Sequence, residues 1–148
     1  MAFTLRSSAF ADGDEIPRQF TCDWDNVSPP LAWSQTPPGT KSFALIMADP
    51  DAPGGTFTHW LLYDVPASTI EIDGHVAGHM LANDFGRPGY GGPCPPRGHG
   101  PHRYVFTLYA VDVPALEVQG QTRGALERAL RPHTLATARL VGRYERKK

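Results

Sequence analysis

The chain lacks any apolar run long enough to cross a bilayer, so no membrane span is expected. Its first residues lack the basic head and apolar run of a secretory signal, which makes the cytoplasm the expected location. No block of like charges occurs and the net charge is −1, so the electrostatic signature of a nucleic-acid-binding protein is missing. The function classes that remain are small-molecule binding, protein binding and catalysis.

Cysteine is scarce, with Cys22 and Cys94 as the only two in the chain. Two cysteines are compatible with free thiols or with one disulfide, and their spacing does not decide between these. Because the cytoplasm keeps thiols reduced, free thiols are expected here.

Glycine and proline are abundant instead, with 15 of each, and they cluster between apolar runs. This pattern predicts many tight turns rather than a disordered chain. With 148 residues, of which 41% are hydrophobic, residues 1–148 suit a single domain with one core.

Short apolar runs bounded by turn residues predict buried strands. The last of these runs is especially rich in β-branched and aromatic residues, which favour strands. The predicted strands span residues 42–48, 57–65 and 102–112. The expected fold class is therefore mainly β and mostly antiparallel, with one or two short helices.

A helix is predicted over residues 122–130, where apolar residues recur at helical spacing and Thr122 is a candidate N-cap. Residues 135–144 fit a last strand or further helix. Two loops are expected between these elements, an ordered one over residues 21–33 and a long Gly/Pro-rich one over residues 83–101. A loop of the second length inside a compact domain is usually functional.

Titratable residues stand where the predicted strands begin or end. Asp49 ends the first strand, and Asp51 follows at the spacing that keeps side chains on one face of a strand. His59 begins the second strand, on the face of Leu61 and Tyr63. If the two strands pair as antiparallel neighbours, Asp49 and His59 meet at one end of the sheet.

The third strand begins with His102, directly after the long loop, and Tyr104 shares its face. The two are thus expected at that same sheet end, in a cavity walled by the loop. Arg103 points to the opposite face, so it is expected to be a structural partner of a carboxylate or a loop carbonyl.

Such a cavity offers donors for a small oxyanion such as phosphate: two imidazoles, one phenol and the backbone N–H groups of Gly91 and Gly92. Asp49 and Asp51 oppose an anion, unless one carboxyl is protonated or one holds an imidazole as a protonated donor. Both cases predict that affinity depends on pH.

Three other kinds of chemistry remain open. A metal is conceivable on Asp49, Asp51, His59 and His102, although their spacing matches no known signature and no cofactor is expected. Covalent catalysis by Cys94 with His102 lacks an evident activator. A small hydrolase of phospho- or carboxylic esters, using Asp and His as acid and base, is the alternative to a binding protein.

Several motifs resemble, in order and at compatible spacing, those of the phosphatidylethanolamine-binding protein family, which includes the Raf kinase inhibitor protein. The two signatures are Asp49-Pro-Asp-Ala-Pro53 with His59-Trp60, and Pro95-Pro96-x-Gly98 with His102-Arg-Tyr104. Further motifs match the bacterial and archaeal branch: Thr21-Cys-Asp, Asn26-x-Ser-Pro-Pro-Leu-x-Trp33, Asp84-Phe-Gly86, Gly89-Tyr-x-Gly-Pro-Cys-Pro-Pro96 and Leu140-Val-Gly-x-Tyr144.

The resemblance implies a large antiparallel sheet packed on a smaller one, with a pocket for phosphate-like groups at one sheet end. The corresponding pocket positions are Asp49, Asp51, Pro53, His59, Pro95, His102 and Tyr104. Cys94 stands where animal members have a glycine, so Gly92 is expected to take over that backbone role. The short segment 66–83 and the ending at Lys148, without the C-terminal helix of animal members, imply a more open site.

The resemblance leaves several partners open. Family members bind phospholipid head-groups or regulate kinases, which implies a phosphate-like ligand, a phosphorylated protein, or a role in kinase signalling. A homodimer is also compatible with the sequence.

Overall fold

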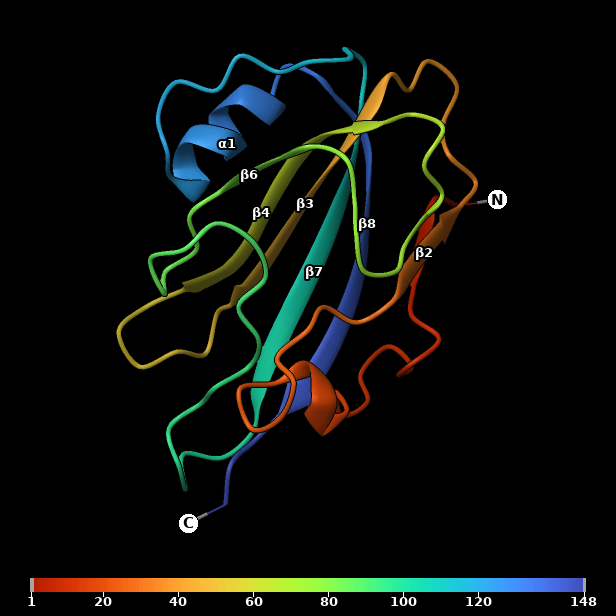
Figure 1. Cartoon of the computed structure of the whole chain (residues 1–148). Helices are drawn as coiled ribbons and strands as arrows, with labels where there is room; N and C mark the ends of the chain where they lie inside the picture. The colour runs from red at the N-terminus through yellow and green to blue at the C-terminus, as the bar shows by residue number, and fades with distance from the viewer. Residues whose placement is uncertain (1, 148) are drawn as a thin grey trace.

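The computed structural model describes residues 2–147, which form two antiparallel sheets with one α-helix and one short 3-10 turn (Figure 1). The small sheet has the strand order β1-β2-β5 and the large one the order β6-β4-β3-β7-β8. The elements are β1 (Thr4–Arg6), η1 (Arg18–Phe20), β2 (Leu31–Ser34), β3 (Ser42–Asp49), β4 (Phe57–Pro66), β5 (Glu71–Ile72), β6 (His79–Leu81), β7 (His102–Val111), α1 (Arg123–Leu130) and β8 (Thr134–Tyr144).

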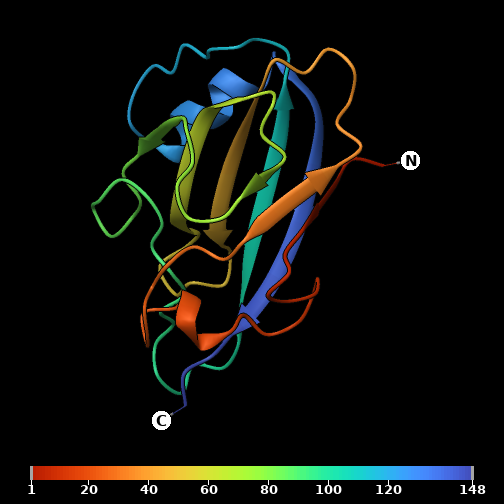
Figure 2. The same cartoon turned by 45° about the vertical axis from the view of Figure 1, so that its right-hand side comes forward.

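Both faces of the large sheet are buried, so the described chain has three layers. Figure 2 shows β2 of the small sheet crossing in front of the large sheet, with α1 behind it. The larger apolar cluster lies between the sheets and includes Trp33, Phe43 and Phe106. The second cluster lies under α1 and includes Ile46 and Leu126. Burial on both faces explains why residues 42–48 are apolar without alternation.

The three long predicted strands are confirmed as β3, β4 and β7, and residues 134–144 form a strand rather than a helix. The predicted helix is confirmed as α1. Its first turn is capped by Thr122, whose side-chain oxygen accepts a hydrogen bond from the N–H of Ala125 (3.1 Å). The prediction of a loop over residues 21–33 is wrong at its end, because β2 begins at Leu31. A strand of four residues is too short to show a period of two.

A β-bulge separates the pocket end of β4 from the rest of the strand. Met47 pairs with Trp60, but the next residue of β3, Ala48, pairs with Thr58, so His59 is an extra residue on β4. A bulge shifts the alternation of side chains along its strand. The prediction that His59 shares the face of Leu61 is therefore wrong. Leu61 packs under α1, whereas the ring of His59 lies against Tyr104, in the layer between the sheets.

Candidate functional site

A cavity of about 520 Å³ lies at the end of the large sheet where β3 ends and where β4 and β7 begin. Its walls come from these strand ends, from the β3–β4 loop and from the long loop between β6 and β7. Of the eight side chains or backbone positions expected in the pocket, six line this cavity: Asp49, Pro53, His59, Pro95, His102 and Tyr104. Asp51 and Gly92 do not line it.

His102 and Asp49 form a buried pair at the floor of the site. The Nδ1–H of His102 donates to Asp49 Oδ2 over 2.7 Å, and the two side chains are only 2% and 4% exposed. On the other side of the ring, His102 Nε2 lies 2.6 Å from His99 Nδ1, so one hydrogen is shared between the two imidazoles. Asp49 thus orients an imidazole, which was one of the two roles expected for an aspartate next to an anion.

His59 is a buried imidazole held by the long loop. Its Nδ1–H donates to the carbonyl of Gly91 (2.6 Å), and the N–H of Gly91 donates back to the carbonyl of His59 (2.9 Å). Burial lowers the pKa of His59 below its ordinary value of 6.5, so the ring is neutral at pH 7. With the proton on Nδ1, Nε2 carries a lone pair until the ring takes up a second proton.

Aromatic rings surround His59 and complete the wall. The ring centroids of Phe57, Tyr104 and Phe85 lie 4.9, 5.2 and 5.5 Å from that of His59. Burial, together with the charges of Asp49 and Asp51, raises the pKa of Tyr104, so its hydroxyl stays protonated as a donor. Phe57 and Phe85 line the cavity but were not expected there, although Phe85 belongs to a motif that the sequence shares with the family.

Asp51 faces away from the cavity and pairs with Arg103. The guanidinium donates from Nε to Oδ2 (3.0 Å) and from Nη2 to Oδ1 (2.8 Å). These hydrogen bonds lower the pKa of Asp51 to about 2, so it stays ionised and shares no proton with Asp49. The alternation of side chains along a strand does not extend to Asp51, because β3 ends at Asp49 and a turn follows. Arg103 lies on the outer face beside a carboxylate, as predicted.

Gly92 lies behind the cavity wall rather than in it. Its N–H donates to Asn26 Oδ1 (2.8 Å), so this donor is not free for a ligand. A Cβ at this position would lie 2.3 Å from Asn26 Oδ1 and 2.4 Å from the carbonyl oxygen of Phe20. Glycine is needed here because two chain segments approach closely, which the sequence alone does not show.

Gly92→Ala is therefore expected to destabilise the protein by about 3 kcal/mol, since backbone atoms must move to admit the methyl group. Urea unfolding followed by circular dichroism measures this loss. The matched control is Gly54→Ala, because a Cβ at Gly54 meets no atom within 4 Å and the φ of Gly54 is not positive. Equal stability of the two variants would contradict the close packing of Gly92.

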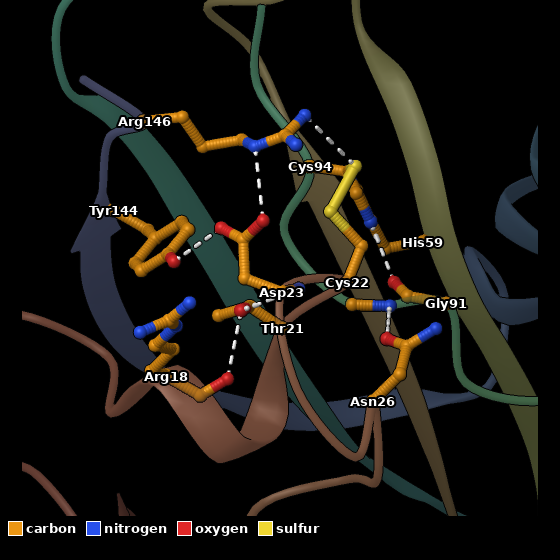
Figure 3. Close-up of a disulfide and its surroundings, with 11 residues drawn as sticks. Arg18, Thr21, Cys22, Asp23, Asn26, His59, Gly91, Cys94, Tyr144 and Arg146 are labelled. Carbon is orange, nitrogen blue, oxygen red and sulfur yellow. Dashed lines mark hydrogen bonds and ion pairs between the residues drawn. A yellow bond between two sulfur atoms is a disulfide. The ribbon is translucent and has the colours of Figure 1, made fainter. Parts of the chain in front are cut away.

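Cys22 and Cys94 form a disulfide, so the expectation of free thiols is wrong (Figure 3). The two sulfurs meet because the segment around Cys94 packs against the loop that follows η1. There, the N–H of Cys22 donates to the carbonyl of Pro93 (3.1 Å). Cys94 also lines the cavity. A contact between residues that are 72 positions apart is a product of the tertiary fold.

The cavity walls carry no lysine or arginine among residues 2–147. Its donors are therefore imidazoles, a phenol, the hydroxyl of Thr56 and backbone amides, while Asp49 and Asp84 are its acids. The four residues considered for a metal are not assembled, because Asp51 points outward. Within residues 2–147, no group of three or more His, Cys, Asp or Glu side chains is arranged to hold a metal ion.

Two antiparallel sheets with a His- and Asp-lined cavity at one sheet end define the class of this protein as a two-sheet β protein with a cavity at the sheet end. The sequence model described as phosphatidylethanolamine-binding protein matches residues 6–145. The chain therefore belongs to the phosphatidylethanolamine-binding protein family, as the sequence motifs predicted.

Individual relatives agree with this family. A UPF0098 protein of Aquifex aeolicus is 49% identical, over 95% of this chain and 86% of the relative. A Mycobacterium tuberculosis protein named as a proposed lipoprotein, LppC, is 44% identical over 96% of this chain and 72% of that protein. The crystal structure of CT736, a phosphatidylethanolamine-binding protein homolog from Chlamydia trachomatis, superposes with a TM-score of 0.91 at 36% identity, covering 99% of both chains.

Proposed function

We propose that this chain is a binding protein for a small phosphate-type anion, free or as a phosphoryl head-group, which it holds in the cavity at the sheet end. The observation that carries the proposal is the pair of buried imidazoles, His59 and His102, each fixed through Nδ1 by an acceptor. Because Nε2 of His102 already lies 2.6 Å from His99 Nδ1, the ring nitrogen that faces the ligand is Nε2 of His59. Tyr104 adds a hydroxyl donor to the same cavity, and its ring centroid lies 5.2 Å from that of His59 and 6.4 Å from that of His102. The cytoplasmic location expected from the sequence stays a proposal, and the Cys22–Cys94 disulfide counts against it, because the cytoplasm keeps thiols reduced.

The absence of lysine and arginine from the described walls gives the imidazoles the decisive role. Neutral His59 has no hydrogen on Nε2, so it donates to an anion only after taking up a proton. Binding of the anion is thus coupled to protonation of His59. The described lining offers no serine, and Cys94 is in a disulfide, so neither residue type supplies a nucleophile there. The alternative of a small hydrolase that uses Asp and His as acid and base has no observation that favours it over binding.

Anion affinity is expected to rise as the pH falls from 8 to 5. Burial places the pKa of His59 below 6.5, so the donor form becomes populated only on the acid side of that value. Isothermal titration calorimetry with sulfate measures the effect, because sulfate itself keeps its charge over this range. The proton uptake on binding is read from titrations in two buffers of different ionisation enthalpy. Affinity that is flat with pH would overturn the coupling.

Three probes, measured by the same calorimetry, distinguish the possible sources of the phosphoryl group. They are inorganic phosphate, phosphoethanolamine and a phosphoserine peptide, with the unphosphorylated peptide as control. Preference for phosphoethanolamine supports a lipid head-group ligand. Preference for the phosphopeptide supports a phosphoprotein partner and with it a role in kinase signalling. Binding of none of the three would overturn the proposed function.

A further inference from the structure

The disulfide stands in the cavity wall, in contact with a cation. Cys94 lines the cavity, and Arg146 Nη1 lies 3.6 Å from Cys94 Sγ (Figure 3). Cys22 and Cys94 are both half-buried, so the bond is neither sealed in the core nor fully exposed. Partial exposure of both residues favours access of a reductant without prior unfolding.

The charges around the two sulfurs differ. Arg146 is the cation next to Cys94, and its Nε lies 3.2 Å from Asp23 Oδ1. Asp23 directly follows Cys22 in the chain, and a hydrogen bond from Tyr144, with the charge of Arg146, holds the pKa of this carboxyl below its usual range. The carboxylate of the residue next to Cys22 is thus ion-paired with Arg146, whereas the guanidinium itself contacts Cys94 Sγ.

We propose that Cys22–Cys94 is a redox-active disulfide that exchanges with dithiols, that Cys94 is the sulfur released, and that its release weakens anion binding in the cavity. A neighbouring guanidinium stabilises a thiolate, and a stabilised thiolate is the better leaving group in exchange. Among residues 2–147, Cys22 Sγ receives no such hydrogen bond from a cation, so a thiolate on Cys22 lacks this stabilisation. Attack is therefore directed to Cys22.

The exchange is balanced by the dithiol, which is the reductant. Its first thiolate attacks Cys22 Sγ, the protein S–S bond breaks, and Cys94 Sγ leaves with the electron pair as a thiolate next to Arg146. The second thiol of the reagent then attacks the first sulfur of the reagent, which is bonded to Cys22 in the mixed disulfide. This step releases Cys22. The reagent ends as a disulfide, and its two electrons and two protons reduce the protein cysteines.

The effect on the cavity rests on the proposed function. Three hydrogen bonds keep the preceding wall in place after reduction: Tyr90 OH to the Phe20 carbonyl, Gly92 N–H to Asn26 Oδ1 and Cys22 N–H to the Pro93 carbonyl. Loosening is therefore confined to Cys94 and the following Pro95. A thiolate there also repels an anion. We expect phosphate affinity to fall about tenfold on reduction.

Equilibration of the full chain with oxidised and reduced dithiothreitol, followed by alkylation and intact-mass analysis, measures the exchange constant. Arg146→Met is expected to lower the constant for reduction about tenfold relative to wild type, or about 30 mV. Arg139→Met, at an exposed position on β8, is the matched control and is expected to leave it unchanged. A variant that merely destabilised the fold would ease reduction instead. No shift, or easier reduction, in Arg146→Met would overturn the role of Arg146.

The direction of attack is tested with glutathione, acid quenching, alkylation and peptide mass spectrometry. Glutathione on Cys22 with Cys94 alkylated supports the proposal. The reverse pattern overturns it, and so does a bond that both glutathione and dithiothreitol leave intact.

Calorimetry with inorganic phosphate then compares the oxidised and reduced proteins. Equal affinity would overturn the link to the cavity, whereas no binding by either form would overturn the proposed function and leave the exchange results standing.

Discussion

Loss of the Cys22–Cys94 bond is expected to lower the free energy of unfolding by about 4 kcal/mol. The bond closes a loop of 72 positions, and opening such a long loop restores much conformational entropy to the unfolded chain. Domains of this size are stable by roughly 5–15 kcal/mol, so the reduced chain is expected to stay folded at 25 °C. Urea unfolding of the oxidised and reduced proteins measures the difference.

The double variant Cys22→Ala/Cys94→Ala provides the control for this measurement. It is expected to unfold at the urea concentration of the reduced protein, and addition of reductant is expected to leave its midpoint unchanged. A difference below about 1 kcal/mol between the oxidised and reduced proteins would contradict the estimate from loop length.

His59→Asn is expected to weaken phosphate binding by about 30-fold at pH 5.5, because a hydrogen bond to a charged group contributes about 2 kcal/mol. The asparagine amide reaches roughly the position of Nδ1, so it preserves the donor to the Gly91 carbonyl, which accepts from His59 at 2.6 Å. What it removes is Nε2, the atom that faces the ligand in the proposed function. Calorimetry with phosphate at pH 5.5 and 8 measures the loss.

The matched control is His79→Asn, which alters an exposed histidine on β6 outside the cavity. It is expected to bind phosphate as the wild type does at both pH values. If the His59 variant also kept the affinity and the pH dependence of the wild type, the imidazole of His59 would not be the proton-coupled donor.

The sequence could predict much of this protein because its strongest signals are local. Apolar runs bounded by turns located β3, β4 and β7, and a cap residue with helical spacing located α1. The same strand ends located Asp49, His59 and His102, since antiparallel neighbours bring consecutive strand ends together. Short strands such as β2 and β5 were missed because two to four residues show no period.

Predictions from side-chain alternation failed at two residues, in different ways. Alternation placed His59 on the face of Leu61, but a bulge opposite β3 turned it towards Tyr104 and the cavity. Alternation also placed Asp51 on the face of Asp49. However, β3 ends at Asp49, and the Asp51 carboxylate accepts a hydrogen bond from Arg103 on the outer face. A period of two holds only while both strands keep a regular register.

The sequence by itself determined the family, the β class and the set of imidazoles and carboxylates at one sheet end. Each of these depends on patterns among residues that are close together along the chain. The tertiary structure alone decided that Asp49 orients His102, that Asp51 and Gly92 lie outside the cavity, and that Cys22 meets Cys94. These outcomes depend on contacts between distant segments. The pairing of β3 with β7 sets the contacts of Asp49 and Asp51, and the packing of the long loop against the N-terminal loop sets those of Gly92 and Cys94.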